Sequence, residues 1–304
     1  MDIGYRSCEL CPRRCGADRT RGELGWCRCG DELRLAFGGL HFGEEPPLSE
    51  PGGSGTLFFS GCPLGCPTCQ NIQISSRRDS LGKGISEKEL ADLCLDLQNR
   101  GAENINLVTG THYIPSLAAV LHDAKQRGLE IPIVWNSSGY ERPEALELIH
   151  SLIDIYLVDL KTLNFETAGR FCGHPMYPEA AEDTLRWVIS HTPADYHNGR
   201  LVKGVILRHL LFPHELASTR EVLRWFSLNG GDALLSLMQQ FIDPLGVLKA
   251  DREAEGDLLD MLDEFGIQKG FIQELGDDEL WMPDFNRLNP FPETFCKPVW
   301  NWNG

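Results

Sequence analysis

The feature that most constrains the fold of this 304-residue chain is the alternation of apolar, strand-like runs with amphipathic helical segments. The strand-like runs lie at 56–60, 105–108, 131–135, 153–160, 205–210, 234–238 and 270–274. Helical patterns lie at 86–100, 114–127, 141–152, 178–191, 215–227 and 251–264. This rhythm predicts βα units and a parallel sheet of the α/β class. About six repeats are typical of an open or closed βα barrel, which carries its chemistry at the carboxyl ends of the strands.

Two segments fall outside this alternation. Residues 1–50 are rich in Cys, Gly and Pro, so we expect a small module held by ligands more than by a core. Gly52-Gly53-Ser54-Gly55 marks a junction, and the barrel is expected over 51–275. The tail at 276–304 is expected to be ordered but irregular, and it either covers the barrel mouth or simply packs on the barrel. Its aromatic anchors are Trp281, Phe285, Trp300 and Trp302.

Composition excludes several functional classes. The chain is 42% apolar and 24% charged, which excludes a mainly disordered protein. Its net charge of -16 argues against nucleic-acid partners and against an anionic membrane surface. No run approaches the ~18–20 apolar residues of a membrane helix, and the N-terminus lacks a signal-peptide pattern. We therefore expect a cytoplasmic protein, in which clustered cysteines indicate metal or cluster ligands because structural disulfides are rare there.

A C-x3-C-x2-C motif formed by Cys62, Cys66 and Cys69 directly follows the first predicted strand. Three thiolates bind three irons of a [4Fe-4S] cluster and leave the fourth iron open for a substrate. Gly61 and Gly65 suit a loop that wraps a bulky cluster, because glycine tolerates left-handed backbone angles. The alternative is a structural zinc site, but such sites usually have four protein ligands, and no fourth Cys or His follows nearby.

A second group of cysteines precedes the barrel. It consists of Cys8, Cys11, Cys15 and Cys27, with Cys29 as a spare thiol. Four thiolates hold either a structural zinc or a second [4Fe-4S] cluster. We expect a metal-bound module here. The metal either stabilises a segment too small to fold alone, or the module serves as an electron relay or substrate-binding element.

These features together resemble the radical S-adenosylmethionine (SAM) superfamily, which has C-x3-C-x2-C after the first strand of a βα barrel. Gln70-Asn71 after the third cysteine and Asp159-x-Lys161 at the end of the fourth strand are similar to the branch of pyruvate formate-lyase activating enzymes. The resemblance covers roughly residues 5–285. It implies a partial (β/α)6 TIM-like barrel behind the small cysteine-rich module.

The resemblance also implies an oxidoreductase chemistry. The open iron would chelate the amino and carboxylate groups of SAM, and the reduced cluster would cleave SAM to methionine and a 5′-deoxyadenosyl radical. That radical would abstract a hydrogen atom from the substrate. Such chemistry implies an electron donor such as flavodoxin or ferredoxin, and a cluster with one open iron predicts an anaerobic setting.

Polar residues at the strand ends are implied to bind SAM. Thr109 and Thr111 follow the second strand, in place of the Gly-Gly-Glu of many members, and are expected to accept from the SAM ammonium. Asn136 and Ser138 follow the third strand and are candidates for the ribose hydroxyls or the carboxylate. The structural alternatives are helix caps at both places.

The fourth and fifth strands end in charged residues. Asp159 and Lys161 bind a ligand or ion, or else form a structural ion pair with each other. Arg208 is expected to bind the methionyl carboxylate in a bidentate manner. The next residue, His209, either joins the site or packs in the core as a hydrogen-bonded histidine.

Three functions fit the sequence. The first is an activase that abstracts hydrogen from a glycine of a partner glycyl radical enzyme. The second is a radical SAM enzyme acting on a small molecule or another peptide site. The third is a non-catalytic iron–sulfur protein that carries electrons or binds partners. The open iron and the polar strand ends weigh against the third.

Overall fold

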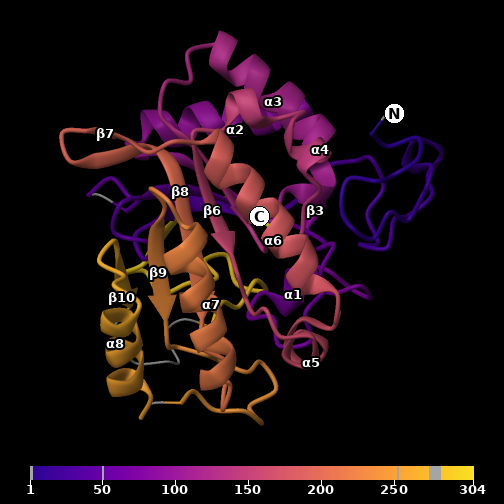
Figure 1. Ribbon diagram of the computed structural model, residues 1–304. Helices are drawn as coiled ribbons and strands as arrows, with labels where there is room; N and C mark the ends of the chain where they lie inside the picture. The colour runs from indigo at the N-terminus through magenta and orange to yellow at the C-terminus, as the bar shows by residue number, and fades with distance from the viewer. Residues whose placement is uncertain (1–2, 50, 252, 274–281) are drawn as a thin grey trace.

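The computed structural model describes residues 3–49, 51–251, 253–273 and 282–304. One sheet has the strand order β10-β9-β8-β6-β5-β4-β2-β1-β11. Seven of these strands run parallel, and the arrows of β6, β8 and β9 point the same way in Figure 1. They are β2 (Ser54–Phe59), β4 (Ile105–Val108), β5 (Ile133–Ser137), β6 (Ile155–Asp159), β8 (Arg200–Leu210), β9 (Leu234–Met238) and β10 (Gly270–Gln273).

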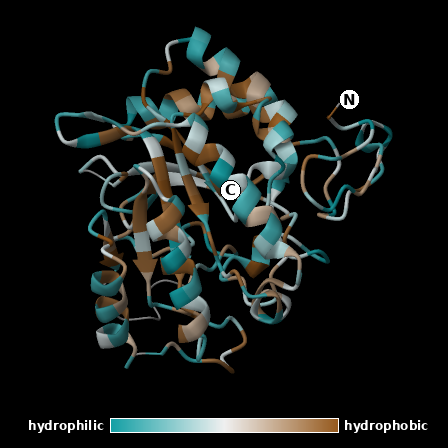
Figure 2. Cartoon of the chain, in the orientation of Figure 1, coloured by the Kyte–Doolittle hydropathy of each residue, from teal (hydrophilic) through white to brown (hydrophobic). Residues whose placement is uncertain are grey.

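Long helices connect the parallel strands. They are α2 (Glu87–Asn99), α3 (Ile114–Gln126), α6 (Tyr177–His191), α7 (Leu216–Asn229) and α8 (Glu255–Glu264). Figure 2 shows brown, apolar strands between helices that carry much teal, as expected for helices with one face on a sheet. The predicted α/β class and partial barrel are confirmed. In the part of the chain that the structure describes, no helix is long and apolar enough to cross a membrane.

The start of α2 follows from its sequence. The Ser86 hydroxyl accepts the backbone N–H of Glu89, and the Glu89 carboxylate accepts the backbone N–H of Ser86. This reciprocal capping box satisfies two backbone donors that a helix start otherwise leaves unpaired.

The predicted helix at 141–152 is wrong in extent. The segment forms α4 (Pro143–Leu146) and a separate 3-10 turn at His150–Leu152. Its buried apolar side chains are few, namely Ala145, Leu146 and Ile149, while Glu147 and Leu148 are exposed. A continuous helix would therefore gain little from packing, which supplies most of the stability of short helices.

Several elements were not predicted. Two of them, β1 (Arg34–His41) and β11 (Cys296–Asn301), extend the sheet antiparallel beyond β2. The others are β3 (Lys83–Gly84), β7 (Asp195–His197), α1 (Ile72–Ser75), α5 (Phe165–Thr167), a π-helical turn at Ala168–Cys172, and 3-10 turns at Arg19–Arg21 and Thr111–Tyr113. Thus 34–49, which the sequence grouped with the N-terminal module, includes a strand of the barrel sheet. The division of the chain into domains stays a prediction.

The inward faces of the strands change from apolar to polar toward their carboxyl ends. Since side chains alternate between faces, residues two apart share a face. The inward pairs are Val134 and Asn136, Leu157 and Asp159, Ile206 and Arg208, and Leu234 and Ser236. The apolar members pack around Leu48, which comes from the segment after β1. The barrel base is therefore filled, and a polar layer lies above it.

The tail contributes to the core. Phe285 is 1% exposed, and its ring centroid lies 5.5 Å from that of Phe58 on β2. Phe291 packs on the same ring at 5.5 Å. The indole N–H of Trp302 donates to the Phe285 carbonyl at 2.7 Å. The described tail is thus part strand and part packed loop, while Trp281 lies outside the described residues.

Replacing Phe285 tests this packing. We expect Phe285→Ala to lower the free energy of unfolding by about 3–5 kcal/mol, because it leaves a cavity among aromatic rings. Urea unfolding followed by circular dichroism measures the change. Phe165→Ala is the control, since Phe165 is 49% exposed. Equal effects of the two substitutions would contradict a structural role for the tail.

Candidate active site

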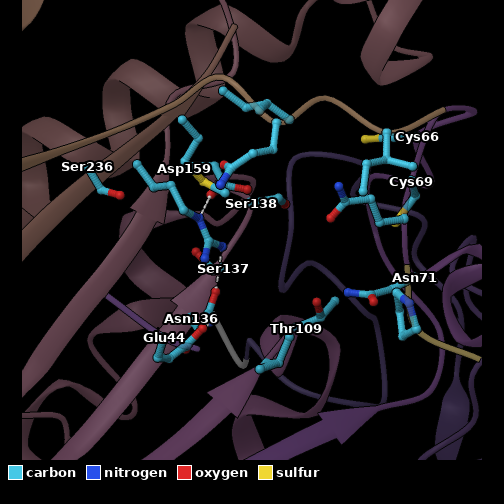
Figure 3. A pocket seen from close by; sticks show the side chains of 18 of the residues that line it. Glu44, Cys66, Cys69, Asn71, Thr109, Asn136, Ser137, Ser138, Asp159 and Ser236 are labelled. Atoms are coloured by element: carbon cyan, nitrogen blue, oxygen red, sulfur yellow. Dashed lines mark hydrogen bonds and ion pairs between the residues drawn. The ribbon is translucent and has the colours of Figure 1, made fainter. Parts of the chain in front are cut away.

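A cavity of about 700 Å³ opens among the carboxyl ends of the parallel strands. This volume lies within the ~300–1,000 Å³ range of small-molecule sites. Figure 3 shows Cys66 and Cys69 on one side of it, and Glu44, Asn136, Asp159 and Ser236 on the other. The cavity therefore has a thiol end and a polar wall, as the sequence predicts for this edge of the barrel.

The cysteine loop depends on two glycines. Gly61 has φ +84° and Gly65 has φ +68°, in the left-handed region that disfavours other residues. A Cβ atom at position 61 would also collide with the Sγ of Cys29. The N-terminal module packs on the same loop, where the Arg13 guanidinium donates to the carbonyls of Pro63 at 3.3 Å and Leu64 at 3.1 Å.

The three thiols fit a cluster site. All three cysteines are free of disulfides. The Cys62 sulfur accepts from the backbone N–H groups of Leu64 and Gly65, and the Cys69 sulfur accepts from the Ser75 hydroxyl, whereas the Cys66 thiol donates to Cys172. Donors to sulfur are the outer contacts that orient thiolate ligands and tune iron–sulfur centres. Cys62, Cys66 and Cys69 would therefore hold three irons of a [4Fe-4S] cluster.

Burial makes these thiols dependent on a metal for ionisation. It raises the pKa of Cys62 to about 12. Metal binding must therefore displace the thiol proton, which couples cluster binding to pH. Cys172, which the sequence left unassigned, lies on the π-helical turn behind Cys66 and is fully buried.

A chain of charged contacts forms the polar wall. Asp159 accepts from Lys161 Nζ at 2.6 Å and from Arg208 Nε at 2.6 Å. Arg208 Nη2 also donates to Asn136 Oδ1 at 2.8 Å. Burial alone would raise the pKa of Asp159, but Arg208 and Lys161 together lower it. The structure thus brings four of the predicted residues into one ionised network, and Ser138 lines the cavity beside them.

Of the two threonines after β4, Thr109 lines the cavity and Thr111 does not. Thr109 lines the cavity with φ +62°, an unusual backbone angle for a β-branched residue. Such strained positions are concentrated at functional sites. Thr111 is 2% exposed, and its hydroxyl donates to the Glu141 carboxylate. Its side chain is therefore paired with that carboxylate and is not among the residues that line the cavity, and its contact with SAM stays a prediction.

Two histidines lie outside the cavity. His209 pairs with the Leu160 carbonyl at 2.7 Å and with the Thr219 hydroxyl at 2.9 Å, so it is a core histidine. His112 is buried with Nε2 at 2.8 Å from the Ser60 carbonyl. Neither ring lines the cavity.

Sequence reasoning missed two glutamates, Glu44 and Glu45, which we call the carboxylate floor. They follow β1, whose last residue pairs with the first residue of β2, so their segment enters the barrel from the amino-terminal ends of its strands. Glu44 accepts from the side-chain amides of Asn106 and Asn136. Glu45 Oε1 accepts from the Ser236 hydroxyl at 3.3 Å. Both precede β2 and so lack the strand-end position that revealed the other candidates.

A buried cation, Arg19, lies beside two of the N-terminal cysteines, Cys8 and Cys27. Arg19 is fully buried, donates to the His112 carbonyl at 2.6 Å and lies 3.8 Å from Cys8 Sγ. No carboxylate among the described residues pairs with it. The pKa of Arg19 is raised by Cys27 and Cys8, against the effect of burial. Burial raises the pKa of Cys8, and the hydrogen bond with Cys29 and burial raise that of Cys27, so thiolates here would need a bound metal to displace their protons.

Glu141 offers a test of the buried polar layer. Burial raises its pKa from 4.5 to about 7, although Thr111 and Ser137 donate to it. The folded state then binds a proton more tightly than the unfolded chain, so Glu141 should cost stability as pH rises from about 5 to 8.

We expect wild type to lose on the order of 2–3 kcal/mol relative to Glu141→Gln over that interval. Urea unfolding of both proteins at the two pH values measures this difference. A difference that stays constant with pH would show that Glu141 is ionised in the folded protein.

Comparisons with known proteins agree with this site. Residues 56–225 match the family model of the radical SAM superfamily. An uncharacterized protein of Methanocaldococcus jannaschii is 31% identical over 247 residues, covering 78% of this chain and 66% of that protein. Methylornithine synthase shares the fold, with a TM-score of 0.52, 15% identity, and coverage of 69% of this chain and 60% of that one.

A domain of a pyruvate formate-lyase-activating enzyme from Bacteroides vulgatus is also similar, with a TM-score of 0.39 and 15% identity over 53% of this chain and 92% of that domain. The family match spans more than half of the chain and includes the cysteine loop. This chain therefore belongs to the radical SAM superfamily.

Proposed function

We propose that this protein binds SAM in the 700 Å³ cavity and uses it to abstract a hydrogen atom from a substrate. The observation that supports this most is the placement of three free thiols, each with a hydrogen-bond partner, across the cavity from an ionised polar wall. When bound, a [4Fe-4S] cluster with SAM supplies one-electron cleavage of the SAM carbon–sulfur bond and a 5′-deoxyadenosyl radical.

The chain's own residues would hold and orient SAM. Arg208 and Lys161 are the cationic groups suited to the methionyl carboxylate, and Asp159 fixes both of them. Thr109, Asn136 and Ser138 offer polar groups to the ammonium and the ribose hydroxyls.

Apolar side chains would keep water away from a reactive radical. Phe171, Phe212 and Phe241 line the cavity and pack as one group, with the Phe171 and Phe212 rings stacked at 4.3 Å. Exclusion of water and of stray hydrogen donors prevents side reactions of reactive intermediates.

Two substrate types accord with this chemistry. One is a glycine in a partner glycyl radical enzyme, as in the activases. The other is a small molecule that enters the cavity. The charged floor at Glu44 and Glu45 favours the small molecule, because a peptide glycine brings no charge to match it. Either reaction needs a reductant such as flavodoxin or ferredoxin.

We also propose that Cys8, Cys11, Cys15 and Cys27 hold a metal ion or a second cluster. The buried Arg19 supports an anionic metal–thiolate centre there. In the described residues no three His, Cys, Asp or Glu side chains, whether in this module or at Cys62, Cys66 and Cys69, already converge as a preformed metal site. Metal binding would then complete the folding of this module, as in other small metal-bound segments.

SAM cleavage tests the main proposal. The anaerobically reconstituted, dithionite-reduced protein should form 5′-deoxyadenosine from SAM, and Cys62→Ala should abolish this because one cluster ligand is lost. Chromatography of the quenched reaction measures the product. Cys94→Ala is the control, since Cys94 is a fully buried cysteine of α2 remote from the motif. A full cluster without SAM cleavage would support the non-catalytic alternative.

Metal analysis tests the N-terminal centre. Wild type should contain about four irons plus one zinc, or about eight irons, and Cys11→Ser should lose the zinc or about four irons. The 5′-deoxyadenosine assay is run alongside. Unchanged metal content in Cys11→Ser and in Cys27→Ser would contradict a metal at this place.

A further inference from the structure

One oxygen of the carboxylate floor has no hydrogen-bond donor among the described residues. Glu45 is 8% exposed, and no described group pairs with its Oε2. Asn106 donates its amide to Glu44, but its own Oδ1 is also without a partner among the described residues. A buried polar atom left unpaired costs about 1–3 kcal/mol. Of these two residues Glu45 lines the cavity, and its ionised carboxylate accepts at Oε2, so the group that completes this place is a donor.

The charges around the cavity also favour a donor, in this case a cationic one. Three carboxylates line it, those of Glu44, Glu45 and Asp159, against two cations, Lys161 and Arg208. His41 does not add a charge, because burial lowers its pKa to about 4. Asp159 already binds both cations at 2.6 Å. Arg208 Nη1 is 3.6 Å from Glu45 Oε1, which is a longer contact than the one Arg208 makes with Asp159. When both glutamates are ionised, the carboxylate floor has excess negative charge; burial opposes this ionisation, raising the pKa of Glu45 to about 7 and that of Glu44 above its usual value, and a bound cation would offset that cost.

The floor contacts Asn136 and Arg208, which we assign to SAM, but Glu44 lies across the cavity from the thiols. Figure 3 places Glu44 and Asn136 across the cavity from Cys66 and Cys69. The superfamily chemistry holds the SAM ammonium at the iron beside those cysteines. A second molecule is therefore needed to bring a donor cation to Glu44 and Glu45.

We propose that the carboxylate floor binds a primary ammonium group of the substrate, so that the substrate is a small amine. This inference rests on the proposed function. Glu45 Oε2 accepts one N–H, and the Glu44 carboxylate, which also lines the cavity, accepts another. An ammonium group has three donors and one positive charge, which matches both the orphaned acceptor and the excess charge.

A matched set of probes tests the proposal on the full-length, cluster-loaded, SAM-bound protein. The probes are n-butylammonium, n-butanol and butyrate, which share a short alkyl chain and differ in head group. Saturation-transfer NMR measures binding. We expect n-butylammonium to bind about tenfold more tightly than n-butanol, as expected for one charge-assisted hydrogen bond, and butyrate to bind least.

Substitutions locate the binding. Glu45→Gln and Glu44→Gln should each weaken n-butylammonium binding by about tenfold and leave n-butanol unchanged. Glu147→Gln, which changes an exposed carboxylate, should have no effect. Equal binding of n-butanol or butyrate in wild type, or unchanged n-butylammonium binding in both floor variants, would overturn the proposal.

Two further measurements distinguish failure of the amine proposal from failure of the proposed function. If Glu45→Gln weakens SAM binding as much as it weakens n-butylammonium binding, the floor serves the ammonium of SAM and the substrate proposal is wrong. If wild type binds n-butylammonium but forms no 5′-deoxyadenosine, the amine site stands and the proposed function fails.

Discussion

The site depends on the alternation of side chains along parallel strands. On one face, each of β5, β6, β8 and β9 carries an apolar residue followed two positions later by a polar one. The apolar layer is packed around Leu48 and closes the barrel base. The polar layer above it is therefore held on rigid strands rather than on loops. The ion pairs of Asp159 with Lys161 and Arg208 then fix the wall that faces the thiols.

The two ends of the cavity are joined by packing as well as by the sheet. Gly61 and Gly65 allow the cysteine loop to turn closely, and the N-terminal module covers its outer side through Arg13 and Cys29. A metal in that module would stabilise the surface against which the loop packs. The module can therefore influence the cluster even if it carries no electrons.

The sequence predicted the barrel, the cysteine loop and most of the polar wall because these follow from local periodicity and strand-end position. It did not predict β1, or the edge strand β11, whose partner β1 is distant in the chain. Strict alternation of side chains on β8 would have placed His209 in the core, because His209 points to the face opposite Arg208. The carboxylate floor was not predicted, because Glu44 and Glu45 belong to a segment that enters the barrel from the amino-terminal ends of its parallel strands. The strand-end rule, which found the other candidates, gives no signal there.

The most direct test of the central claim is electron–nuclear double resonance on the reduced, cluster-loaded protein with SAM labelled by ¹⁵N in its amino group and ¹⁷O in its carboxylate. If Cys62, Cys66 and Cys69 leave one iron open for SAM, both labels should show hyperfine coupling to the cluster. A fully assembled, reduced cluster that couples to neither label would contradict the claim that this cavity brings SAM to the open iron.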